Sequence, residues 1–275
     1  MLRFRPGIKN VKIAGLQPDI AWENPEENFR RVARLAEHAV RAGARLLALP
    51  EAFATGFSMR AVPMVEHTES TRYFLSELAQ THGVWILGGY IELGDSRPVN
   101  ACSVIGPDGR EALHCRKIHP FTLAGEHEHF ETGSTVRTGM IDGVRITPLI
   151  CYDLRFVELF RAAASQTDLF IVIANWPAAR AHAWRTLLAA RAIDCQAYVL
   201  GVNRVGDAEG HPHCGDTTLV DPMGRVEATL PNEEGVVLGE VDPDTVASIR
   251  KRYPFLRDRR PDVYRRMAGF QENQS

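Results

Sequence analysis

The sequence predicts an α/β protein, a four-layer α-β-β-α sandwich of two mixed β-sheets flanked by helices. Two observations carry this prediction. Strand-like apolar runs outnumber helix-like runs, and hairpin signals at Gly106-Pro107-Asp108-Gly109 and around Asp221-Pro222-Met223-Gly224-Arg225 are inserted between β-α units. A doubly wound parallel sheet would alternate strands and helices more strictly.

The first half of the chain opens with an apolar strand and a well-marked helix. Asn24 is a capping residue, Pro25 suits the first helical position, and Gly43 ends the apolar pattern at helical spacing. The elements expected in order are a strand at 11–16, a helix at 24–43, a strand at 45–50, a helix at 71–81, a strand at 84–91 and a hairpin of strands at 99–105 and 111–117.

The second half repeats this arrangement. The elements expected are strands at 144–150, 168–174, 198–203 and 235–241, two hairpin strands flanking 221–225, and helices at 153–165, 181–196 and 242–252. No linker rich in Gly, Ser or Pro divides the chain. We therefore expect one domain over 1–275, with a core at about 8–250 and a C-terminal tail at 253–275.

Composition narrows the classes of partner. The 275 residues have a formal net charge of −2, 45% are hydrophobic and 24% are charged, which is typical of a soluble protein without a nucleic-acid or membrane partner. Five cysteines without a Cys-x-x-Cys pair favour reduced thiols and a cytoplasmic location. The pairs His127/His129 and His211/His213 lack the further ligands of a metal site, so we expect no metal and no cofactor.

The segment Pro148-Leu149-Ile150-Cys151-Tyr152-Asp153 delivers a thiol to the end of a buried strand. Amide donors at the start of a following helix can favour a thiolate and bind an oxyanion. Taken alone, Cys151 is better explained as a small buried hydrophobic residue.

Two other charged residues also stand at strand ends. Glu51 follows the apolar run that ends at Pro50, and Lys117 ends the second hairpin strand. A carboxylate base, a thiol nucleophile and a fixed ammonium are complementary in acyl-transfer chemistry. Each charge taken singly is more typical of a solvated loop or strand end, so the hypothesis depends on the three residues occurring together.

The joint pattern resembles the nitrilase superfamily of carbon–nitrogen hydrolases over nearly the whole chain. The matching segments are Leu49-Pro50-Glu51, Arg116-Lys117-Ile118-His119 and Ile150-Cys151-Tyr152-Asp153-Leu154-Arg155-Phe156. The resemblance implies Glu51 as general base, Lys117 as charge stabiliser, Cys151 as nucleophile and a thioester intermediate. It also implies a supporting glutamate, for which Glu126 is the first candidate and Glu128 the second.

Further segments are similar to the omega-amidase branch, which acts on terminal amides of 2-oxo acid monoamides such as 2-oxoglutaramate and 2-oxosuccinamate. These are Ala174-Asn175-Trp176-Pro177, Ala189-Ala190-Arg191-Ala192-Ile193-Asp194, Gly201-Val202-Asn203-Arg204-Val205-Gly206 and Gly215-Asp216-Thr217. The loop at 122–129 departs from the branch, which leaves open an amidase for a carbamoyl, deaminated-glutathione or aliphatic amide substrate. A non-catalytic scaffold or sensor is the third possibility.

Several side chains near these motifs are candidates for binding a small amide substrate: the Tyr152 backbone amide for the oxyanion, Arg155 or Arg180 for a substrate carboxylate, and Trp176 and Phe121 as pocket walls. Ion pairing with acids explains either arginine equally well. Core packing is an equally good explanation of Trp176. The family resemblance further implies a homodimer or higher homo-oligomer formed by helices packing face to face.

Overall fold

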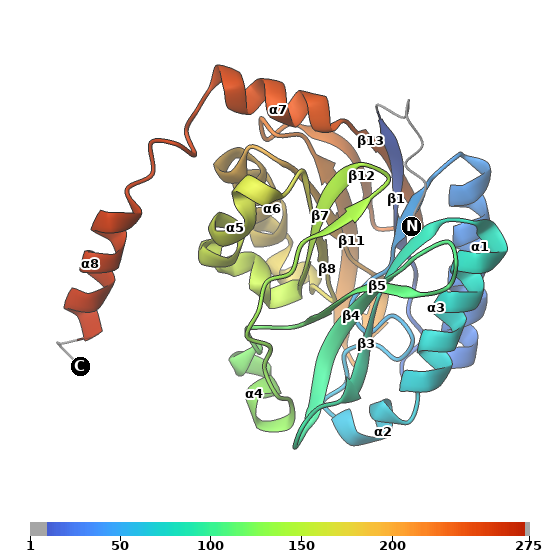
Figure 1. The fold of residues 1–275 in the computed structure, drawn as a ribbon. Helices are drawn as coiled ribbons and strands as arrows, with labels where there is room; N and C mark the ends of the chain where they lie inside the picture. Colours follow the sequence, from blue (N-terminus) through green and yellow to red (C-terminus); the bar gives the residue numbers. More distant parts are fainter. Residues whose placement is uncertain (1–9, 273–275) are drawn as a thin grey trace.

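Two mixed β-sheets pack face to face in the middle of the molecule. The computed structural model describes residues 10–272 (Figure 1). The first sheet has the strand order β13-β1-β2-β3-β4-β5. Its strands are β1 (Val11–Gln17), β2 (Leu46–Ala48), β3 (Trp85–Leu93), β4 (Pro98–Ile105), β5 (Glu111–Arg116) and β13 (Gly235–Val241). The pairs β1–β2 and β2–β3 are parallel and the others are antiparallel.

The second sheet has the order β10-β11-β9-β8-β7-β6, with β12 paired to β11. Its strands are β6 (Gly139–Ile141), β7 (Val144–Ile150), β8 (Leu169–Ile173), β9 (Tyr198–Val202), β10 (Val205–Ala208), β11 (His211–Val220) and β12 (Val226–Pro231). Here β7, β8 and β9 are parallel. The carboxyl ends of β7 and β8 therefore lie at one edge of the sheet.

Helices cover the two outer faces, as Figure 1 shows. The helices are α1 (Pro25–Arg41), α2 (Ala61–Val65), α3 (Thr68–His82), α4 (Glu126–His129), α5 (Val157–Ala163), α6 (Ala181–Cys195), α7 (Pro243–Arg252) and α8 (Pro261–Glu272). Buried residues of α1 and α3 form one apolar cluster with the first sheet, and those of α5 and α6 form another with the second. The predicted four-layer α-β-β-α sandwich is confirmed.

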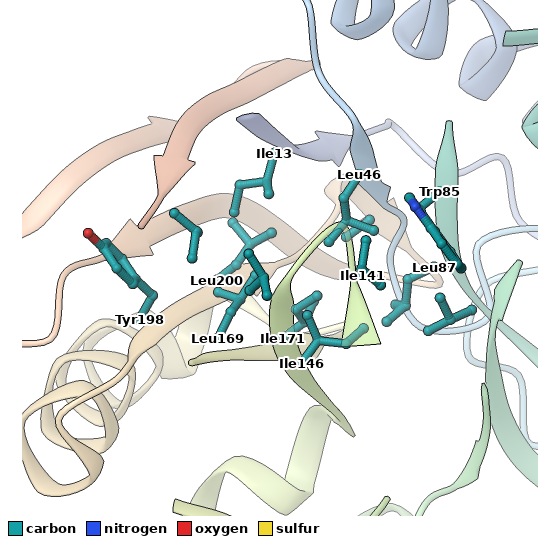
Figure 2. Packing of buried hydrophobic residues seen from close by; sticks show 14 of the residues in the cluster. Ile13, Leu46, Trp85, Leu87, Ile141, Ile146, Leu169, Ile171, Tyr198 and Leu200 are labelled. Atoms are coloured by element: carbon teal, nitrogen blue, oxygen red, sulfur yellow. The ribbon is translucent and has the colours of Figure 1, made fainter. Parts of the chain in front are cut away.

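The central core lies between the sheets. Figure 2 shows branched side chains of both inner faces in contact, among them Ile13, Leu46, Leu87, Ile146, Ile171 and Leu200. Burying one such side chain contributes roughly 1.5–3 kcal/mol, so this layer fixes how the sheets face each other. The same packing brings strand ends of both sheets to a common edge, where the candidate site lies.

Most expected elements appear within a few residues of their predicted bounds. Asn24 caps α1 as predicted, and its side chain accepts a hydrogen bond from the Glu27 amide at 3.2 Å. The short helices α2 and α4 and the strands β6 and β10 were not foreseen. The expected tail contains α8, which lies away from the body of the molecule in Figure 1. No helix within residues 10–272 is long and apolar enough to cross a membrane.

The helix expected at 153–165 is wrong as a single element. A 3-10 turn covers Cys151–Arg155, and α5 begins only at Val157. Phe156 between them has φ −99° and ψ 95°, which is extended backbone, so the helical hydrogen bonds cannot run through it. The residues after the nucleophile candidate thus form a separate short turn.

Candidate active site

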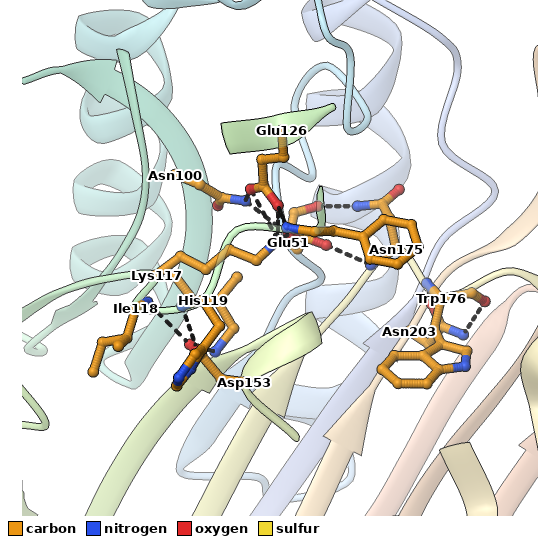
Figure 3. A network of polar contacts seen from close by, with 12 residues as sticks. Glu51, Asn100, Lys117, Ile118, His119, Glu126, Asp153, Asn175, Trp176 and Asn203 are labelled. Atoms are coloured by element: carbon orange, nitrogen blue, oxygen red, sulfur yellow. Dashed lines mark hydrogen bonds and ion pairs between the residues drawn. The ribbon is translucent and has the colours of Figure 1, made fainter. Parts of the chain in front are cut away.

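Two glutamates and one lysine form a buried cluster at the shared edge of the sheets (Figure 3). The Lys117 ammonium lies 2.9 Å from Glu51 Oε1 and 2.9 Å from each carboxylate oxygen of Glu126. Exposed fractions are 0% for Glu51, 2% for Lys117 and 1% for Glu126. Charges buried this deeply are stable only when paired, and each of these has a partner. The sequence prediction that Glu51 and Lys117 meet is consistent with this geometry.

Glu51 is held rigidly from three sides. It follows β2, and its Oε1 accepts a second hydrogen bond from Asn100 Nδ2 at 2.7 Å. Its Oε2 accepts the Asn175 backbone amide at 2.8 Å, while Asn175 Nδ2 donates to the Glu51 carbonyl. The ends of β2, β4 and β8 thereby fix one carboxylate.

The structure separates the two candidates for the second glutamate. Glu126 starts the short helix α4, and besides Lys117 its carboxylate accepts the Phe121 backbone amide and Asn100 Nδ2. The Glu128 side chain is 68% exposed and lies near His127 at the surface. Only Glu126 belongs to the cluster.

Cys151 directly follows β7 and has a positive φ of 47°. For a residue other than glycine this left-handed conformation is strained, and such strain is common where a side chain must be presented to a ligand. Cys151 is also the first residue of the 3-10 turn, so the first amides of that turn have no partner within it. The long helix expected to supply a dipole here is absent.

Burial and the neighbouring charges set the electrostatics of the cluster. Burial raises the pKa of the Cys151 thiol well above its ordinary value, the Glu51 carboxylate raises it further, and the Lys117 ammonium opposes both. Amide donors that could favour a thiolate therefore do not dominate the pKa of this thiol. Burial acts to lower the pKa of Lys117, but Glu51 and Glu126 outweigh it and raise that pKa, so the lysine stays charged. Burial also raises the pKa of Glu126, against the opposing effect of Lys117.

A cavity of about 580 Å³ opens onto Cys151 and Lys117. All five candidate substrate-binding residues line it: Phe121, Tyr152, Arg155, Trp176 and Arg180. Glu51 and Glu126 lie behind this wall. The arrangement offers a ligand a thiol and an ammonium at the cavity wall, with a carboxylate base behind them.

The two arginines in the cavity stack on aromatic rings. The Arg155 guanidinium lies 5.1 Å from the Trp176 ring centroid, and that of Arg180 lies 4.9 Å from the Phe121 ring centroid. Within residues 10–272 neither side chain forms an ion pair with an acid. Both guanidinium groups are therefore available to an anionic ligand.

Trp176 is a fixed wall of this cavity. Asn203 Oδ1 accepts a hydrogen bond from the Trp176 backbone amide at 2.8 Å, and its Nδ2 donates to the Trp176 carbonyl at 3.0 Å (Figure 3). The indole N–H donates to the Arg180 carbonyl at 2.9 Å. These bonds tie the Trp176 backbone to the end of β9 and its ring to the segment that carries Arg180.

Sequence reasoning missed Asn100, Asn175 and Phe57 as parts of the site. The Phe57 ring lies 4.7 Å from the Lys117 ammonium, where it adds cation–π stabilisation. A usable signal existed for Asn100, an amide inside the apolar run Val99–Ile105. Buried amides need partners, so a lone one within a strand indicates a polar cluster.

The histidine pairs weighed as metal ligands do not form such a site. Across the part of the chain that the structure describes, no group of three or more His, Cys, Asp or Glu side chains is arranged to hold a metal ion. His211 and His213 instead lie at the cavity, on the strand β11.

Comparisons with known proteins agree with this geometry. Residues 12–251 match the family described as carbon-nitrogen hydrolase. The chain belongs to the carbon–nitrogen hydrolase family. It is 35% identical to the omega-amidase YafV of Yersinia enterocolitica, over 91% of this chain and 97% of that protein. It is 33% identical to the 2-oxoglutaramate amidase of Bacillus subtilis, over 92% of this chain and 98% of that protein.

A solved carbon–nitrogen hydrolase has the same fold. XC1258 of Xanthomonas campestris, described as a superfamily protein with an arsenic adduct in its active site, superposes with a TM-score of 0.86 at 31% identity. The match covers 91% of this chain and 97% of that one. The nitrilase-superfamily resemblance in the sequence is therefore confirmed for the family and for the fold.

Proposed function

We propose that this carbon–nitrogen hydrolase is an omega-amidase that hydrolyses the terminal amide of a 2-oxo acid monoamide, such as 2-oxoglutaramate or 2-oxosuccinamate, to the 2-oxo acid and ammonia. The observation that carries the proposal is the cavity in which Cys151 and Lys117 lie with two guanidinium groups, those of Arg155 and Arg180, that pair with no acid among residues 10–272. Such a cavity suits an amide with a carboxylate at its far end. The names of the relatives from Yersinia and Bacillus support the same substrate class.

In the first half of the proposed reaction, Glu51 takes the Cys151 proton while the sulfur attacks the amide carbon. A base is needed because the raised pKa keeps the resting thiol protonated. The oxyanion is stabilised by the Lys117 ammonium and the Tyr152 backbone amide. Glu51 then protonates the leaving nitrogen and the C–N bond breaks. Ammonia departs, and the acyl group remains bound to Cys151 as a thioester.

In the second half, Glu51 removes a proton from water, which attacks the thioester carbon. The C–S bond breaks, the acid leaves, and the proton returns to the thiol. Glu126 orients the Lys117 ammonium throughout, because its two oxygens and Glu51 Oε1 surround the same nitrogen. Every proton transfer in these two steps is between Glu51, Cys151, the substrate and water.

The test compares the activity of the purified protein on 2-oxoglutaramate, 2-oxosuccinamate, a carbamoyl compound, deaminated glutathione and neutral aliphatic amides. Release of ammonia should be fastest from the 2-oxo monoamides, by at least tenfold in kcat/KM. A preference for any other class would overturn the substrate assignment, and no turnover of any amide would favour a binding protein.

We also propose a homodimer or higher homo-oligomer assembled through α5 and α6, acting in the cytoplasm. Two apolar side chains near the outer face of α6 support the assembly, since Ile193 is 51% and Met223 43% exposed. The five cysteines are all unpaired, which suits a reducing compartment. Light scattering during size-exclusion chromatography tests the assembly, and cell fractionation tests the location.

A further inference from the structure

Asp153 is a buried carboxylate that the proposed reaction does not use. It is 1% exposed and lies two residues after Cys151 in the 3-10 turn. Oδ1 accepts the His119 backbone amide at 2.9 Å and is 3.0 Å from His119 Nδ1. Oδ2 is 3.4 Å from the Ile118 amide and 3.3 Å from the Ile150 amide. A carboxylate accepts hydrogen bonds only, so all four nitrogens donate to it.

These donors come from the two segments that carry the reacting groups. Ile118 and His119 directly follow Lys117, and Ile150 directly precedes Cys151. One side chain thus joins the end of β5 in the first sheet to the end of β7 in the second (Figure 3). The His119 ring is fixed further by stacking on Phe156, with ring centroids 3.5 Å apart and an angle of 9° between the rings.

The link acts where the backbone is strained. Cys151 has a positive φ of 47°, and the Ile150 amide next to it is one of the four donors. A strained turn persists only when its surroundings hold it. On the other side, the Lys117 backbone amide donates to the Asn100 carbonyl at 2.8 Å, and the Lys117 carbonyl accepts the Gly133 amide at 2.6 Å. Neither of these two contacts reaches β7, the strand that leads to Cys151, whereas Asp153 does.

We propose that Asp153 is a positioning residue that fixes the Lys117 ammonium relative to the Cys151 sulfur. The inference rests on the proposed function, since it assigns Asp153 a part in the reaction of Cys151. Coulomb interactions and hydrogen bonds to a developing oxyanion depend steeply on distance. A displacement of about 1 Å between such groups can cost about 10²-fold in rate.

The test replaces Asp153 with Asn and compares it with Asp168→Asn. The asparagine side chain has the same size as that of aspartate, but its NH₂ group replaces one of the two accepting oxygens. It therefore places N–H donors against N–H groups that now donate to Asp153. Asp168 is a matched control: it is 2% exposed, accepts the Arg145 amide at 2.9 Å, and lies just before β8, away from that strand's carboxyl end. Both variants should lose thermal stability.

Only Asp153→Asn should change the chemistry. We expect kcat to fall 10- to 100-fold with KM within threefold, and kcat of Asp168→Asn to stay within threefold of wild type. Alkylation of Cys151 by iodoacetamide, followed by peptide mass spectrometry, should move to higher pH in Asp153→Asn alone, because Lys117 no longer lowers the thiol pKa as strongly. An unchanged kcat and alkylation profile in Asp153→Asn overturns the proposal.

A second variant tests the proposal in case Asp153→Asn does not fold. Of the four donors to Asp153, His119→Phe removes the Nδ1 donor and leaves the three backbone amides, and it keeps a ring against Phe156. It should lower kcat three- to tenfold and shift the alkylation profile in the same direction, and an unshifted profile there contradicts the positioning role. If the wild-type protein hydrolyses no 2-oxo monoamide, the proposed function fails, while the alkylation profiles still decide the inference about Asp153.

Discussion

The Lys117 ammonium lies 2.9 Å from both carboxylate oxygens of Glu126, nine residues further along the chain. The same nitrogen lies 2.9 Å from Glu51 Oε1. One cation thus sits between two buried carboxylates, and its position is set by three oxygens. A lysine on a flexible stem needs such contacts if it is to stabilise an oxyanion without moving during the reaction.

Replacing Glu126 with Gln should lower kcat about 100-fold. Glutamine fills the same space, but it loses the charge that holds Lys117, and its amide group places donors against the ammonium. The unfolding free energy should fall by about 1–3 kcal/mol because a buried charged hydrogen bond is lost. Steady-state rates and chemical denaturation measure the two effects.

Glu128→Gln is the matched control, since the same side chain two residues away is exposed. Its kcat and stability should stay within error of wild type. Equal losses in the two variants, or a loss confined to Glu128→Gln, would contradict the assignment of Glu126 to the site.

Replacement of Cys151 should abolish activity, whereas its effect on stability should depend on whether alanine or glycine takes its place. Cys151→Ala and Cys151→Gly both remove the nucleophile, so both should lose at least 10⁴-fold in kcat/KM. The backbone at this position has φ +47°, which glycine adopts freely and alanine does not. The glycine variant should therefore be more stable than the alanine variant by about 1 kcal/mol. Retained hydrolysis in either variant would refute the nucleophile, and a less stable glycine variant would refute the strain.

Much of the fold was predictable because its signals are local. Asn24 and Pro25 mark the start of α1, and Gly106–Gly109 marks the turn between β4 and β5. The helix predicted after Cys151 failed for a tertiary reason: Asp153, which a helix would turn to solvent or to its own first turn, accepts amides of another segment instead. Apolar periodicity cannot report such a long-range bond.

The candidate site was predictable where residue type and strand end coincide, as for Glu51 and Cys151. Asn100 and Asn175 were missed because each contributes a hydrogen bond to Glu51, which is distant in the sequence; the Asn100 bond lies within the first sheet, and the Asn175 bond joins the two sheets. Glu126 was the first candidate from the sequence and Glu128 the second, and the burial of the Glu126 carboxylate beside Lys117 agrees with that order. Contacts between distant segments are the information that a single sequence lacks.

Arg180 should contribute more than Arg155 to binding a substrate carboxylate. Arg180 is half-buried and Arg155 is exposed, and an exposed charge is screened more strongly by water and salt. Arg180→Gln should raise KM for 2-oxoglutaramate 10- to 100-fold, which corresponds to a lost charged hydrogen bond of about 1.5–3 kcal/mol. Arg155→Gln should raise it less than fivefold. Butyramide is the control substrate because it has no carboxylate, and a similar loss on butyramide would show that the arginine shapes the cavity without binding the anion.

The raised pKa of Cys151 predicts a specific loss of stability in alkali. Burial and the Glu51 carboxylate keep the thiol protonated in the folded protein, whereas in the unfolded chain it ionises near its ordinary pKa of about 8.5. Below that pH the thiol is protonated in both states, so its contribution to stability is constant. Above it the unfolded state binds fewer protons, and stability falls as pH rises toward the folded pKa.

The difference in unfolding free energy between wild type and Cys151→Ala should therefore shift against wild type by about 1.4 kcal/mol between pH 7.5 and 9.5. Comparing the two proteins cancels the titration of the other cysteines. Denaturation with urea at a series of pH values measures the difference. A difference independent of pH would mean that folding leaves the thiol pKa unchanged, and one that favours wild type as pH rises would mean that the site stabilises a thiolate; either result contradicts the prediction.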